Sequence, residues 1–83
     1  MMAEEVRKLT IERVKKEYPV FVNSIDLSIR GAARNGQSKY SVWPGIPQGE
    51  KFEKIKAYYE CQGFKVDAIR RGADVIKMVI SWV

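Results

Sequence analysis

The stretch that decides the fold is the C-terminal one, Gly63-Phe64-Lys65-Val66-Asp67-Ala68-Ile69-Arg70-Arg71 followed by Gly72-Ala73-Asp74-Val75-Ile76-Lys77-Met78-Val79-Ile80-Ser81-Trp82-Val83. It predicts a β-hairpin in which Gly72 supplies the positive φ of the turn. The second arm is apolar on both sides. A period of two puts Ile76, Met78, Ile80 and Trp82 on one side, and Val75, Val79 and Val83 on the other, interrupted by Lys77 and Ser81. Because a strand with two apolar faces belongs inside a sheet, we expect this arm to be the central strand.

The segment before the hairpin predicts a strand and then a helix. Residues 38–43 combine β-branched and aromatic side chains with good alternation, and Pro44 and Pro47 end the strand. We expect Pro47 in the first turn of the next helix and Gly63 as its stop. Of its paired aromatics, we expect one of Tyr58 and Tyr59 in the core and the other over the core's edge. The apolar face of this helix consists of Phe52, Ile55 and Tyr59.

Residues 20–36 fit two alternatives. Ile25, Leu27 and Ile29 alternate as in a strand, whereas a helix would gather an apolar face, could be capped by Asn23 or Ser24 and could end at Gly36. We favour a helix from about Ser24 to Asn35. Its apolar face would be Phe21, Ile25, Ile29, Ala32 and Ala33.

The N-terminal segment predicts a charged helix over Met2 to Tyr18, ended by Pro19. Acidic residues near its start and basic residues near its end suit the helix dipole. Its apolar stripe is loose, and consists of Val6, Leu9, Ile11, Val14 and Tyr18.

Together these elements predict a two-layer α+β fold in the order α-α-β-α-β-β. The C-terminal strand would lie at the centre of a three-stranded sheet, with the second and third helices on the face that bears Ile76 and Met78. At 83 residues the chain predicts a single domain. Within it, residues 1–19 would form an arm for oligomerisation or partner binding, and residues 20–83 the core.

Composition excludes several kinds of site. The chain contains no histidine and a single cysteine, Cys61, which excludes His-based triads and an internal disulfide and makes a zinc site improbable. Its glycines form no phosphate-binding loop, and spacing places no two carboxylates as an acid–base pair. We therefore expect no enzymatic activity, no catalytic residues, no cofactor and no metal. No apolar run approaches the length of a membrane span, so we expect a soluble, unexported chain.

The net charge of +5 leaves two readings open. Basic and acidic residues are interleaved, as on an ordinary solvated surface. Alternatively, Lys65, Arg70 and Arg71 of the hairpin could combine with stacking by Trp43 or Tyr40 to bind nucleic acid or an acidic partner. No RNP-like, KH or zinc-finger spacing accompanies these residues.

The C-terminal sixty residues or so resemble a group of small proteins of tailed bacteriophages. Members of that group end in a helix with paired aromatics, then G-(F/Y)-x-V, a short turn and I-S-W. The matching residues are Tyr58-Tyr59, Gly63-Phe64-Lys65-Val66 and Ile80-Ser81-Trp82. Upstream, Ile25 to Gly36 and Tyr40-Ser41-Val42 resemble the helix and strand that precede them in that group, whereas Met2 to Tyr18 lies outside the pattern. The resemblance implies an architecture and a viral origin, with some members described as virion structural proteins, but no active site.

We therefore expect a non-enzymatic bacteriophage protein that acts through protein–protein contacts, as a virion or assembly component or a host-directed accessory protein. The alternative is a nucleic-acid-binding accessory protein. The expected location is the virion or the host cytoplasm. If two helices cover one face of the sheet, Val75, Val79, Val83 and Trp43 would form an apolar patch on the other, which rarely stays in water. Either the N-terminal helix or a second subunit would cover it, and we expect a homodimer, built on this face or by exchange of the N-terminal helices.

Overall fold

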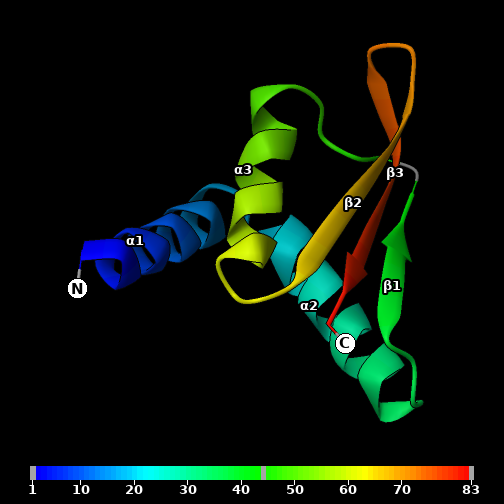
Figure 1. Cartoon of the computed structure of the whole chain (residues 1–83), viewed down its shortest axis with the longest axis horizontal. Helices are drawn as coiled ribbons and strands as arrows, with labels where there is room; N and C mark the ends of the chain where they lie inside the picture. The colour runs from blue at the N-terminus through cyan, green and yellow to red at the C-terminus, as the bar shows by residue number, and fades with distance from the viewer. Residues whose placement is uncertain (1, 44, 83) are drawn as a thin grey trace.

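The computed structural model describes residues 2–43 and 45–82, and has the predicted α+β architecture (Figure 1). The element order α-α-β-α-β-β is confirmed. The helices are α1 (Met2–Glu17), α2 (Pro19–Arg34) and α3 (Glu50–Glu60), and the strands are β1 (Lys39–Val42), β2 (Lys65–Arg71) and β3 (Asp74–Ser81).

The sheet has the strand order β1-β3-β2, with both pairings antiparallel. The C-terminal strand is therefore central, as its two apolar faces predicted. Gly72, at φ 64°, lies in the turn between β2 and β3, in the left-handed region that glycine enters without a steric penalty.

Helices α2 and α3 cover one face of this sheet (Figure 1). Helix α2 packs against β1 and α3 against β2, while α1 contacts α3 and α2 and lies beyond them, away from the strands. The N-terminal helix therefore does not cover the opposite sheet face. The core lies between the helices and this one face. Its buried side chains are Val14, Val22, Ile25, Ile29, Ile46, Phe52, Ile55, Tyr58, Tyr59, Val66, Val75, Met78 and Ile80.

Residues 20–36 adopt the helical alternative, but α2 begins earlier than the predicted Ser24. Pro19 occupies its first turn, where a missing N–H leaves no hydrogen bond unmade. The same proline thus separates α1 from α2 and starts α2. The buried residues follow helical spacing: Val22, Ile25, Ile29 and Ala32.

The start of α3 also differs from the prediction. Pro47 lies in the preceding loop, outside the helix, and the N-cap is Gly49 at φ 61°. Both Tyr58 and Tyr59 are fully buried, so the expectation that one would only cover the core's edge is wrong. Their hydroxyl groups can be buried because both find the same hydrogen-bond acceptor, Asp26.

The predicted assignment of β3 residues to the two sheet faces is wrong at Val75 and Ile76, because the strand contains a β-bulge. Ile69 pairs with Lys77 but Arg70 pairs with Val75, so Ile76 is an extra residue on the bulged strand. The alternation therefore reverses at this point. Val75 is 4% exposed and belongs to the core, whereas Ile76 is 46% exposed. Met78 and Ile80 are fully buried and Trp82 packs against the core, as predicted.

Candidate functional site

The sheet face opposite α2 and α3 carries residues from all three strands and is called here the open face. Side chains along a strand point alternately to the two faces of a sheet, so the residues next to the buried Val66, Met78 and Ile80 lie on the open face. Across β1, β3 and β2 one row of the open face is Lys39, Ser81 and Lys65, and the next is Ser41, Val79 and Asp67. Further along, Lys77 pairs with Ile69.

The apolar patch predicted for this face does not assemble as expected. Val75 lies in the core because of the bulge, and Val83 lies outside the described residues. Trp43 is 67% exposed and follows the last residue of β1, and Val79 is half-buried in the middle of β3. Trp43, Val79 and Ile69 are separate apolar residues, and the open face between them is largely polar. Hydrophobicity alone therefore does not determine what binds there.

The predicted basic group is divided between the two sides of the hairpin. Arg70 pairs with the inward-facing Val75 and therefore lies on the side of the helices. Its guanidinium carbon lies 5.7 Å from the centre of the Phe52 ring and its Nη2 lies 3.9 Å from a carboxylate oxygen of Glu53. Arg71 and Lys65 lie on the open side. Arg70 thus contacts α3 from β2. Of the three predicted basic residues, Lys65 and Arg71 are the ones available on the open face.

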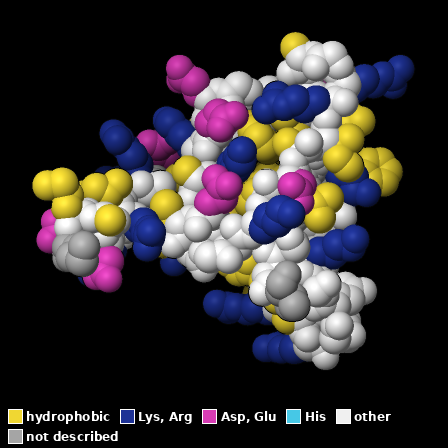
Figure 2. Space-filling model, viewed as in Figure 1, with side chains coloured by type: hydrophobic (Ala, Val, Ile, Leu, Met, Phe, Trp, Pro, Cys, Tyr) yellow, Lys and Arg dark blue, Asp and Glu magenta, His cyan; other side chains and the backbone are white. Residues whose placement is uncertain are grey.

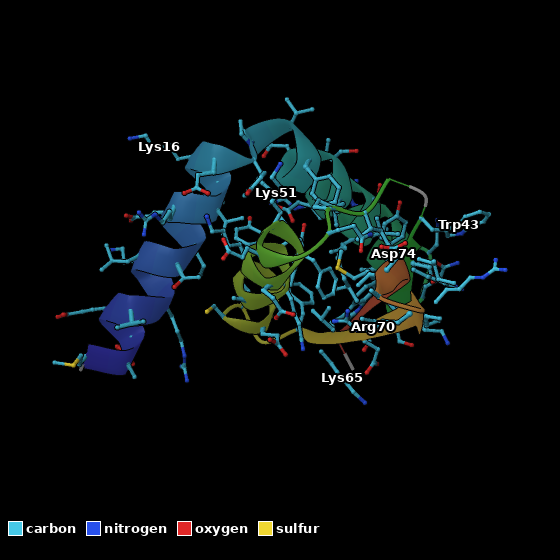
Figure 3. All side chains as sticks on the ribbon, turned by 90° about the horizontal axis from the view of Figure 1, so that it is seen from above. Lys16, Trp43, Lys51, Lys65, Arg70 and Asp74 are labelled. Carbon is cyan, nitrogen blue, oxygen red and sulfur yellow. The ribbon has the colours of Figure 1, made fainter. Side chains whose placement is uncertain are left out.

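Two further cations of the open face were missed from the sequence. Lys39 lies on β1 and Lys77 on β3, so the lysines come from three different strands. Their common placement follows from the register, which the sequence pattern of each single strand does not contain. Trp43 points away from the helices on the same side (Figure 3).

A second candidate surface lies on α1. Val14 is buried and Ile11 packs against the core, while Met2, Val6 and Leu9 lie on the opposite side of the helix, at 79%, 55% and 64% exposure. We call these three residues the outer stripe. Their spacing of four and three residues gathers them on one line along the helix. Hydrophobic side chains are visible at the free end of α1 (Figure 2).

A partly buried polar cluster joins α2 to α3. The Tyr58 hydroxyl donates to Asp26 Oδ2 at 3.1 Å and the Tyr59 hydroxyl donates to Oδ1 at 3.0 Å. Burial, followed by the charge of Asp26, raises the pKa of both phenols, because each effect disfavours a phenolate. A cavity of 240 Å³ beside the cluster is also lined by Lys15 and Arg30. Each carboxylate oxygen of Asp26 already accepts a hydrogen bond from a tyrosine hydroxyl, so the cluster primarily links two helices.

The sequence did not identify this cluster. The partners are separated by 32 and 33 residues, and a single aspartate in an amphipathic helix resembles any solvated charge. The sequence signal was the paired aromatics, whose hydroxyls need partners when buried.

Residues 2–43 and 45–82 contain no group of three or more histidine, cysteine, aspartate or glutamate side chains that could hold a metal ion. In the same residues, none of the helices is both long and apolar enough to cross a membrane. Cys61 is a free thiol, half-buried at the C-cap of α3. No family model, curated protein or solved structure matches the chain.

Proposed function

We propose that this chain is a non-enzymatic bacteriophage protein that acts by binding proteins, as a virion or assembly component or as an accessory protein in the cytoplasm of the infected host. The observation that carries the proposal is the outer stripe of α1. Met2, Val6 and Leu9 face solvent although the same helix already buries Val14 in the core. A helix with apolar side chains on two opposite sides is typical of a helix that packs against a partner on its second side.

The partner that α1 fits best is a second copy of this chain, which would form a homodimer. In an antiparallel pair of α1 helices, Met2 of each helix can lie opposite Leu9 of the other, so the two outer stripes meet along their whole length. Within this segment Glu4 and Glu5 are balanced by Arg7 and Lys8, so the contact brings no net charge repulsion between the two copies.

Helix α1 is held in place for such contacts by the rest of its own chain. Glu17 Oε2 accepts from Lys54 Nζ of α3 at 3.2 Å, and Arg13 Nε lies 3.4 Å from Glu17 Oε1. Val14 anchors the same end of the helix in the core. The proposed dimer therefore uses α1 in its present position and does not need exchange of the helix between subunits.

The phage origin and the absence of catalysis rest on other grounds. The G-F-K-V and I-S-W residues of the hairpin support the phage origin through the resemblance that they carry. The non-enzymatic reading is supported by the lack of histidine and of catalytic motifs, and by the use of Asp26 as a structural acceptor for two tyrosines.

Sedimentation velocity over a concentration series tests the α1 pairing. We expect the wild-type chain to dimerise, and Leu9→Arg to be monomeric but still folded by circular dichroism, with a melting temperature that no longer depends on protein concentration. Leu27→Arg is the matched control, because Leu27 of α2 is 67% exposed and lies outside the stripe. A monomeric wild-type chain, or equal loss of the dimer in both variants, would contradict this interface.

Mass spectrometry of purified particles tests the biological role. The chain should be found in particles of the bacteriophage that encodes it if it is a virion component. Absence from particles together with co-purification of a host protein would overturn the virion version and leave the accessory role.

A further inference from the structure

The open face brings four cations together from separate strands. Lys39, Lys65 and Lys77 come from β1, β2 and β3, and Arg71 lies at the hairpin end of β2. Lys39 and Lys65 both pair with Ser81, so they lie on either side of the central strand in one row. Given the usual spacing of neighbouring strands, their Cα atoms are roughly 10 Å apart.

An exposed aromatic ring lies beside these cations. Val42 pairs with Met78, so Trp43, the next residue, comes level with Lys77. The indole is 67% exposed and directed away from the helices (Figure 3). Ile69 flanks Lys77 on its other side and is 45% exposed. The face therefore offers a flat ring on one side of Lys77 and an apolar side chain on the other.

Charge decides what this face accepts. The carboxylates on it are Asp67 and Asp74, and Asp67 lies 4.0 Å from Lys65 Nζ. Four cations against two carboxylates leave the face net positive. Two copies stacked face to face would bring like charges together, whereas a polyanion would gain from the same charges.

We propose that the open face binds single-stranded nucleic acid, with phosphates along Lys39, Lys65 and Lys77 and an unpaired base stacked on Trp43. A base inside a duplex has both of its faces covered by neighbouring base pairs, so stacking on the indole selects a single strand. This surface differs from the outer stripe of α1, and the inference does not depend on the proposed function.

Fluorescence anisotropy with labelled twelve-nucleotide oligo-dT and oligo-rU, titrated over salt, tests the phosphate contacts. Three lysine–phosphate contacts predict a slope of log K against log salt of about −2, at roughly 0.7 per phosphate. Replacing Lys39, Lys65 and Lys77 by Gln should make this slope much less steep, with Arg71 as the remaining cation of the face, and should reduce binding at low salt at least tenfold. The matched control replaces Lys8, Lys16 and Lys51 of α1 and α3 by Gln, which changes the net charge equally and should leave most of the binding.

Tryptophan emission tests the stacking. Oligonucleotide should quench the emission of the wild-type chain, and Trp43→Ala should weaken binding roughly tenfold. Trp43→Phe keeps an aromatic ring, so it should retain the affinity while the quenching disappears. Circular dichroism of each variant confirms that it is folded.

Three outcomes would overturn the proposal. These are an absence of oligonucleotide binding at low salt, equal losses in the two triple-lysine variants, and binding to a duplex as tight as to a single strand. Dimerisation of the wild-type chain that Trp43→Ala abolishes, without any binding of oligonucleotide, would instead assign the face to a second copy.

Discussion

The side-chain amide of Gln48 occupies both backbone hydrogen-bonding groups of Val75. Its Nε2 donates to the Val75 carbonyl and its Oε1 accepts from the Val75 N–H, both at 2.7 Å. The pairing of β1 with β3 ends at Val42 and Met78, so Gln48 takes the place of a strand residue beyond that end. Nε2 also donates to the Ile46 carbonyl at 3.0 Å, which fixes the loop before α3 against the sheet.

Replacing Gln48 by Ala should destabilise the fold because it leaves a half-buried N–H and C=O of Val75 without partners. We expect a loss of about 2–3 kcal/mol in the free energy of unfolding, measured by urea denaturation. Gln37, exposed in the loop before β1, supplies the control, and Gln37→Ala should stay within about 0.5 kcal/mol of wild type. Equal stability of Gln48→Ala and wild type would show that water replaces the amide without loss.

The bulge makes opposite predictions for neighbouring residues. Val75→Ala should cost about 2 kcal/mol because it opens a cavity in the core, whereas Ile76→Ala should cost less than about 1 kcal/mol. Regular alternation through β3 would reverse this order. Thermal denaturation of the two variants therefore decides whether Ile76 or Val75 faces the helices.

Alkaline pH should weaken the fold through Tyr58 and Tyr59. Their raised pKa values mean that the folded chain retains phenol protons that the unfolded chain releases above pH about 10. The stabilisation is thus complete below that pH and is lost as pH rises above it. Each tyrosine should contribute up to about 1.4 kcal/mol per pH unit to the decline.

Urea unfolding of wild type and Tyr59→Phe between pH 8 and pH 11 measures this effect. The variant should decline less steeply, because phenylalanine has no proton to lose. All other ionisable groups are the same in the two chains, so the comparison isolates the contribution of Tyr59. If the free energy of unfolding declines equally with pH in both chains, the raised pKa assigned to Tyr59 is wrong.

Replacing Arg70 and replacing Arg71 should have different effects on stability and on binding, although the two residues are adjacent. Arg70→Ala removes the cation over Phe52 and should cost roughly 0.5–1 kcal/mol of stability. Arg71→Ala should leave stability unchanged but weaken oligonucleotide binding more than Arg70→Ala does. Denaturation and anisotropy on the same two variants make both comparisons. If the effects are reversed, the assignment of the two arginines to their faces is wrong.

Local patterns in the sequence determined the elements and their arrangement. The two apolar faces of the C-terminal arm required a central strand, and β3 lies there because only that position gives both of its edges a partner. Pro19 separated the first two helices, and Gly72 marked the hairpin turn. These features depend on backbone preferences and periodicity, which operate over a few residues.

Only the tertiary structure decided the faces and the clusters. The bulge at Ile76 moves Val75 into the core because packing against the helices outweighs strict alternation. Asp26 meets Tyr58 and Tyr59 because α2 and α3 pack on the same face of the sheet. The lysines of the open face become neighbours through strand register, a relation between segments distant in the chain. Contacts of this kind depend on how elements pack, and a pattern within one element does not encode them.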